Sequence, residues 1–306
     1  MLKIYNLLGK NLSEILMNSK LAKWSRAPYG AYAAHKVGLT LAQINLSPTP
    51  QPEEIKAPTL ETKGLNVWQL WLQGWADAPP MVSAARTLNE KANPELNFHY
   101  LNLDEACEMV GLDPRVKKLY EQGDIKPSGM ADLLRLLIVA QMGGIWLDAT
   151  VVTSPAFGKL LASSPNFFLI SGRQWDKMAP RQHTVTTWAF GASPGNTFVK
   201  NWAFLQEQHS LRHGQLHHFD AFFCATALIK KGILPVSDIS RPESLALFEG
   251  GSKLIETWLK DRRLESGLET YFAHPLHKLT YKMAPRESEE LVNFLQHVTR
   301  QLDHHK

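Results

Sequence analysis

Two short stretches hold residue types from which an active site can be built. Asp132 and Arg135 stand three apart in the apolar run 130–142, so they share one face of a predicted helix. Asp148 and Thr150 directly follow a second apolar run, in GGIWLDATVV. A carboxylate buried among apolar residues must pair with a cation, bind a metal ion or accept backbone N–H groups. All three partners stay open for Asp148.

The Asp-x-Thr spacing predicts a pair of oxygen ligands. Alternate residues of a strand point the same way, so Asp148 and Thr150 would offer a carboxylate and a hydroxyl on one side. Oxygen ligands suit Mg²⁺ or Mn²⁺, and such ions usually bridge to phosphate groups. For Asp132 and Arg135, the alternative is an ion pair with a purely structural role.

Helices and strands alternate around these residues. Helices are expected at 80–92, 104–110, 114–122, 128–142, 197–209 and 220–230, and strands at 67–72, 98–103, 145–147, 167–171 and 186–191. Ser128 is expected to cap the central helix, and Gly143 and Gly144 to end it. The alternation predicts an α/β sheet with helices on both faces. Asp148 then lies at the carboxyl edge of the sheet, where ligands bind.

Composition and charge exclude several classes of protein. The 306 residues are 44% hydrophobic and 20% charged, as in a soluble globular protein. We expect no transmembrane helix and no secretory signal. The first 46 residues hold six basic side chains and one acidic one, so the rest of the chain is close to neutral and does not suit a nucleic-acid binder. Cys107 and Cys224 are expected to be free thiols of a reducing compartment.

The segment DLLRLLIVAQMGGIWLDATVV, at 132–152, resembles the core of sugar-transferring enzymes with an Asp-x-Asp motif. It is most similar to the capsular polysaccharide synthesis proteins, and more distantly to glycosyltransferase family 32 and the large clostridial glucosylating toxins. VWQLWLQGWADAPPMV, at 67–82, matches the first strand of that group. The resemblance spans 67–155 and implies the type A nucleotide-sugar-binding glycosyltransferase fold, a Rossmann-like mixed sheet flanked by helices.

The resemblance also implies roles for single residues. Asp148 would hold Mn²⁺ or Mg²⁺, directly or through water. Thr150 would be a second, neutral ligand, because it stands where the broader motif has its second Asp. Ala131 replaces a Ser that commonly precedes the helix Asp. Donor binding is implied for Trp71 on the base, Asp132 and Arg135 on the sugar and diphosphate, and Trp146 in the nucleotide pocket.

The stretch FAHPLHKLTYK, at 272–282, is expected to cover the donor. Related enzymes use a C-terminal loop in this way, and some supply a His to the metal. The resemblance therefore implies His277 as a metal ligand and Lys278 as a diphosphate contact. The alternative is a surface loop with ordinary histidines.

Asp220, in HHFDAFFCAT, is a further candidate for the catalytic site. It either faces the acceptor as a base or sugar anchor, or caps the following helix. The histidines at 213–218 are expected to lie in a solvated loop.

The leading prediction is a glycosyltransferase of capsular or other surface polysaccharide synthesis. It would move a sugar from a nucleotide-sugar donor, most simply a UDP-sugar, to a saccharide or lipid-linked acceptor. Arg135, Lys278 and the metal at Asp148 would stabilise the leaving diphosphate. No strong base is evident, which fits a reaction driven by departure of the leaving group, and the resemblance to retaining enzymes implies retention of the anomeric configuration. The alternatives are a phosphohydrolase with Asp148 as nucleophile, and a non-catalytic sugar-binding relic without the second Asp.

The chain is expected to divide into an arm, residues 1–60, and a catalytic domain, residues 61–306. Helical spacing of apolar residues predicts a helix over 2–23, and four prolines in 47–60 predict an extended linker. This basic helix either docks on the domain or rests on an acidic membrane surface. The expected location is the cytoplasm, with peripheral contact at the inner face of the membrane as the second option.

Overall fold

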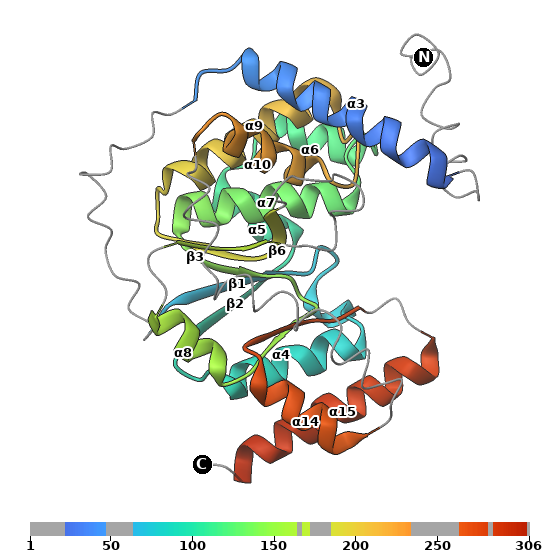
Figure 1. Cartoon of the computed structure of the whole chain (residues 1–306), viewed down its shortest axis with the longest axis vertical. Coiled ribbons are helices and arrows are strands. Elements are labelled where there is room, and N and C mark those ends of the chain that lie inside the picture. Colours follow the sequence, from blue (N-terminus) through green and yellow to red (C-terminus); the bar gives the residue numbers. More distant parts are fainter. Residues whose placement is uncertain are drawn as a thin grey trace.

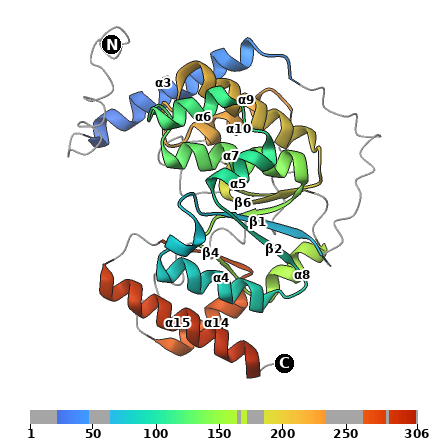
Figure 2. The same cartoon turned by 180° about the vertical axis from the view of Figure 1, so that it is seen from behind.

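The computed structural model describes residues 22–46, 64–163, 167–171, 185–233, 263–280 and 284–304. Over these ranges the chain forms a central sheet with helices on both sides (Figure 1). The predicted Rossmann-like mixed α/β sheet flanked by helices is therefore confirmed. On one side lie α3 (Ala22–Ala42), α5 (Leu103–Val110), α6 (Pro114–Glu121), α7 (Pro127–Met142), α9 (Thr197–His213) and α10 (Asp220–Lys230). On the other lie α4 (Pro80–Ala92), α8 (Ala156–Ser163), α14 (Leu264–Ala273) and α15 (Pro285–His304), as Figure 2 shows from behind.

The central sheet has five strands in the order β2-β1-β3-β6-β5. β1 pairs in parallel with β2 and β3, whereas β6 is antiparallel to β3 and β5. From β1 the chain adds β2 on one side of the sheet and then β3 on the other side. The strand order therefore reverses between β1 and β3, and their carboxyl ends lie at this switch point. The strands are β1 (Asn66–Leu70), β2 (Asn97–Leu101), β3 (Gly144–Leu147), β5 (Phe167–Ser171) and β6 (Val185–Ala192).

α7 carries part of the site and is buried on nearly all sides, as its apolar sequence predicts. Ten of its sixteen residues are buried, including Asp132 and Arg135. The helix turns into β3 through Gly143 and Gly144, whose φ angles are +65° and +87°. A Cβ on Gly144 would lie 2.5 Å from the carbonyl oxygen of Asn66 in β1. The predicted need for glycine at this turn is confirmed.

A second sheet, of two strands, has no counterpart in the sequence prediction. β4 (Val151–Thr153) pairs antiparallel with β7 (Leu276–Lys278), which places Val151 opposite Lys278. Asn89 of α4 holds β4, because its amide donates to the Val151 carbonyl at 2.9 Å and accepts from the Thr153 N–H at 2.7 Å. α15 packs on α4 (Figure 2). The C-terminal region is thereby joined to the chain just after β3.

Most predicted elements have the observed bounds to within a few residues, and α4 and α10 match at both ends. The expected cap at Ser128 is wrong: α7 begins at Pro127, after Lys126, with no side-chain cap, because a proline suits the first turn of a helix. The helices α3, α8, α14 and α15 were not predicted; of these, α3 packs on α9 and α10. Most of the predicted helix 2–23 and all of the linker 47–60 lie outside the described residues. The division of the chain at residue 60 stays a prediction.

Candidate active site

Asp148 stands where β3 ends, beside the carboxyl end of β1. Its backbone N–H donates to the Trp188 carbonyl of β6 at 2.8 Å. Its carbonyl accepts from Gln69 of β1 at 3.3 Å and from the Val151 N–H at 2.8 Å. Three elements thus fix its backbone at the reversal point of the strand order, the place where open α/β sheets bind ligands.

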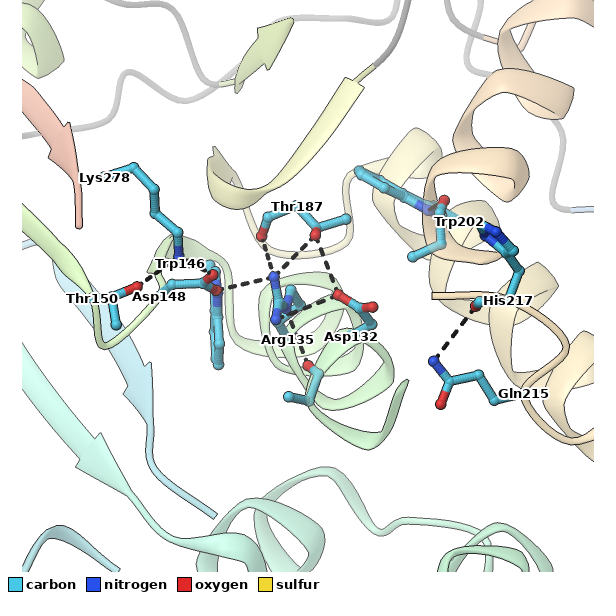
Figure 3. Close-up of polar contacts among 12 residues, drawn as sticks. Asp132, Arg135, Trp146, Asp148, Thr150, Thr187, Trp202, Gln215, His217 and Lys278 are labelled. Carbon is cyan, nitrogen blue, oxygen red and sulfur yellow. Dashed lines mark hydrogen bonds and ion pairs between the residues drawn. The ribbon is translucent and has the colours of Figure 1, made fainter. Parts of the chain in front are cut away.

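Three donors surround the Asp148 carboxylate (Figure 3). Oδ1 accepts from the Trp146 indole N–H at 3.0 Å and forms an ion pair with Arg135 Nη1, also at 3.0 Å. Oδ2 accepts from Lys278 Nζ at 2.6 Å. Burial would raise the pKa of Asp148, but the positive charges of Arg135 and Lys278 outweigh it and hold the pKa below its usual value. The carboxylate is therefore ionised at neutral pH.

Thr150 joins Asp148 in this arrangement, but through a turn. The Val151-to-Asp148 hydrogen bond closes a tight turn after β3, so the two residues do not lie in one strand as predicted. The turn nevertheless brings their side chains together, because Lys278 Nζ also donates to Thr150 Oγ1 at 2.7 Å (Figure 3). The expected convergence of a carboxylate and a hydroxyl is confirmed, with a different backbone reason.

Asp132 and Arg135 lie deeper, on α7. Arg135 Nη2 is 3.4 Å from Asp132 Oδ1, while Nη1 donates to the Thr187 carbonyl at 2.7 Å and to its hydroxyl at 3.0 Å. The Thr187 hydroxyl in turn donates to Asp132 at 3.2 Å. Burial raises the pKa of Asp132, and Arg135 offsets part of that rise. Thr187 was missed in the sequence, although it is one of two adjacent threonines in the mostly apolar β6.

Comparison with known families shows to which of the resembling families the chain belongs. Residues 35–298 match the family model described as "Capsular polysaccharide synthesis protein". The chain belongs to the capsular polysaccharide synthesis protein family. The resemblance carried by residues 132–152 is thereby confirmed at the level of this family. Among curated proteins, no match was found.

A solved structure also resembles this family member. It is titled "PaToxG Glycosyltransferase", is 12% identical, and aligns over 92% of this chain and 98% of its own with a TM-score of 0.41. Within the described residues, none of the helices has the length and apolar character needed to cross a membrane.

The two tryptophans expected at the donor site differ in position. Trp146 of this capsular synthesis protein is 1% exposed, and its indole contributes a hydrogen bond to Asp148 and a face 5.3 Å from the Arg135 guanidinium. Trp71 is half-buried directly after β1, where its backbone N–H donates to the Leu101 carbonyl at 3.0 Å. Trp71 thus stands at the same sheet edge as Asp148.

The structure does not bring His277 to the site. Its ring is fully buried, stacks on Tyr271 and places Nε2 3.1 Å from the Tyr271 carbonyl oxygen. Successive residues of a strand point to opposite faces, so His277 turns away from the face on which Lys278 meets Asp148. Burial lowers the pKa of His277 to about 4, so the ring is neutral at physiological pH.

Asp220 also lies apart from the carboxylate of Asp148. It is 2% exposed, and its Oδ2 accepts from the backbone N–H groups of Leu216 and His217 at 2.8 and 3.1 Å. It holds the loop before α10 but does not cap that helix, whose N-cap is Phe219 with no side-chain cap, so the capping alternative is wrong. The exposed His218 in that loop is close enough for its charge to lower the pKa of Asp132. The expected solvated loop for the histidines at 213–218 is wrong for two of them, because His213 ends α9 and His217 is buried; His218 alone of the three is exposed.

The described residues fit a divalent metal ion poorly. An octahedral Mg²⁺ or Mn²⁺ needs about six ligands, most of them oxygens. Asp148 already faces three donors, and His277 points elsewhere. In the part of the chain that the structure describes, no group of three or more His, Cys, Asp or Glu side chains can hold a metal. The expected Mn²⁺ or Mg²⁺ stays a prediction, and the cations that do face Asp148 are Arg135 and Lys278.

Proposed function

We propose that this chain is a glycosyltransferase of capsular or other surface polysaccharide synthesis. It takes a sugar from a nucleotide-sugar donor, with UDP-sugars as the first class to test, and passes it to a saccharide or lipid-linked acceptor. One observation carries the proposal: Asp148 holds two cationic side chains, Arg135 and Lys278, at the carboxyl edge of the sheet. Membership of the capsular family supports it.

The chemistry follows from where charge develops. When the bond between the sugar and the diphosphate breaks, the leaving diphosphate gains negative charge. Prearranged positive groups stabilise that charge in a site partly shielded from water. Arg135 and Lys278 supply such groups, and Asp148 keeps both of them in place. Trp71, at the same sheet edge, is the proposed stacking surface for the base.

The proposal also covers the stereochemistry of the reaction and the cellular location of the protein. Among the residues that the structure describes, no unpaired carboxylate contacts Asp148 to serve as a strong base, so departure of the leaving group drives the reaction in this proposal, with retention at the anomeric carbon. Cys107 and Cys224 are both buried free thiols, as in a reducing compartment, which supports a cytoplasmic location.

The first experiment is a screen of UDP-, GDP- and dTDP-sugars for stabilisation and turnover. A donor present at a concentration of a hundred times its Kd should raise the melting temperature of the protein by about 5 °C. Asp148→Asn should abolish the shift and lower the rate of donor hydrolysis about 100-fold, because a neutral amide no longer holds the two cations. Asp113→Asn removes the partner of an exposed arginine and should change neither.

The other outcomes of this screen would replace the proposal. Turnover of simple phosphate esters without any response to nucleotide sugars would favour the phosphohydrolase. A folded protein that neither binds nor hydrolyses any of these compounds would favour the non-catalytic relic.

A further inference from the structure

Lys278 stands at the position that the Asp-x-Thr pattern assigns to a metal ion. Its Nζ lies 2.6 Å from Asp148 Oδ2 and 2.7 Å from Thr150 Oγ1 (Figure 3). These are the carboxylate and the hydroxyl that were expected to share a divalent cation. A single positive charge, covalently part of the chain, therefore already lies between the two oxygens.

Hydrogen bonds fix the backbone on both sides of Lys278. Its contact with Asp148 and Thr150 is therefore set by the fold and not by a mobile surface side chain. Lys278 is opposite Val151 in the β4–β7 pair, and the next N–H, of Leu279, donates to the Thr150 carbonyl at 2.7 Å. At the other end of the pair, the Tyr271 hydroxyl donates to the Thr153 carbonyl at 2.7 Å. The strand register thus delivers the ammonium to the turn that carries Asp148 and Thr150.

The ammonium retains capacity for a ligand. It has three N–H donors, and Asp148 and Thr150 accept two of them. Among the described residues the third has no acceptor, and the side chain is 26% exposed. Arg135 lies on the opposite side of the same carboxylate, with 9% of its side chain exposed. Two cations thus share Asp148, and Lys278, the more exposed of the two, has a third N–H without an acceptor among the described residues.

We propose that the Lys278 ammonium takes the place of a divalent metal ion, so that the protein binds the diphosphate of its donor without one. The inference rests on the proposed function, because it names the group that meets the leaving diphosphate. A lysine acts on phosphate as a point charge, and a charge-assisted N–H to a phosphate oxygen replaces a metal–oxygen bond. Asp148 and Thr150 then orient the Lys278 ammonium towards the diphosphate.

The test measures binding of UDP, GDP and dTDP to the full chain by calorimetry, in excess EDTA and with MnCl₂. For the nucleotide that binds, we expect the two Kd values to agree within about threefold. Lys278→Met should weaken binding at least about 30-fold in EDTA, because the charge at the diphosphate is lost. Lys117→Met, which removes an exposed lysine paired with Asp104, should leave both values unchanged.

A charge-reversed variant sharpens the test. Lys278→Asp would place a second carboxylate beside Asp148 and Thr150, which would create an acidic metal-binding set of a kind not found among the described residues. It should bind nucleotide only when Mn²⁺ is present and should deplete the paramagnetic resonance signal of free Mn²⁺ without nucleotide. The wild type should leave that signal unchanged. Circular dichroism establishes that each variant is folded.

Two results would overturn the inference in different ways. Nucleotide binding by the wild type that disappears in EDTA would refute the role of Lys278 and leave the proposed glycosyltransferase intact. Absence of binding in both buffers, for all three nucleotides, would refute the proposed function and the inference with it.

Discussion

At the scale of residues, the site is a line of alternating charge. Asp132, Arg135, Asp148 and Lys278 follow one another at 3.4, 3.0 and 2.6 Å, from the core towards the exposed edge. Each inner member has an opposite charge on both sides, which offsets the cost of removing it from water. The line ends at Lys278, so an anionic ligand would extend the alternation.

Arg135→Lys tests whether the fork of the guanidinium, and not only its charge, holds this line together. Arg135 reaches Asp132, Thr187 and Asp148 from one planar group, and an ammonium cannot match that geometry. We expect a loss of about 2 kcal/mol in the free energy of unfolding, because buried groups lose partners. Urea denaturation measures it.

The matched control for this prediction is Arg115→Lys. Arg115 also forms a fork with an aspartate, Asp113, but 74% of its side chain is exposed. Exposed pairs contribute little, so the change in unfolding free energy should stay below about 0.5 kcal/mol. Equal losses for Arg115→Lys and Arg135→Lys would contradict the importance of the buried fork.

At the scale of elements, two turns determine where the charged residues lie. The turn from α7 into β3 sets the distance between Arg135 and Asp148, and the turn after β3 presents Asp148 and Thr150 to β7. The first turn is tight because β1 passes directly beside Gly144. Space for one hydrogen atom, and not for a methyl group, is therefore a requirement of the site.

Gly144→Ala should separate β3 from β1 and lower the free energy of unfolding by about 3 kcal/mol, from backbone strain and overpacking together. Gly123→Ala provides a control with the strain alone. Gly123 has φ +76° and nothing within 4 Å of its missing Cβ, so its loss should be about 1 kcal/mol. Chemical denaturation compares the two, and similar losses would show that the approach of Asn66 is unimportant.

At the scale of the whole molecule, the site closes only when the C-terminal region meets the centre of the chain. Lys278 and Asp148 are 130 residues apart in sequence. β7 brings Lys278 to Asp148, and the buried residues Tyr271 and His277 hold the segment 271–278 in place. Stability of this region is therefore coupled to the completeness of the site.

The buried His277 makes the stability of the fold depend on pH. An unfolded chain protonates this histidine near pH 6.5, whereas the folded chain resists until about pH 4. Between these values the unfolded state binds more protons, so stability falls as the pH falls, by up to about 3 kcal/mol. His277→Gln should show a shallower decline over this window in urea titrations. Parallel declines for the two proteins would contradict the prediction.

Local sequence patterns were enough to predict the central sheet and the part of the site formed by Asp132, Arg135 and Asp148. Periodicity located the five strands of the central sheet and six of the helices around it, α4, α5, α6, α7, α9 and α10, because apolar patterns report which face of an element is buried. The three-residue spacing of Asp132 and Arg135, the paired glycines and the acid after β3 are all local features. They sufficed to place Asp132, Arg135 and Asp148 at one sheet edge, and the capsular family resemblance came from the same residues.

The contact of Lys278 with Asp148 and Thr150 could be seen only in the folded structure. The pairing of β4 with β7 is non-local and short, so neither strand has a period long enough to detect. A one-residue difference in register would exchange His277 and Lys278 between the two faces of the pair, because neighbouring side chains of a strand point in opposite directions. The same principle places the histidine in the core and the lysine against Asp148 and Thr150. The cation at this site is thus chosen by strand register, which composition and motif spacing do not contain.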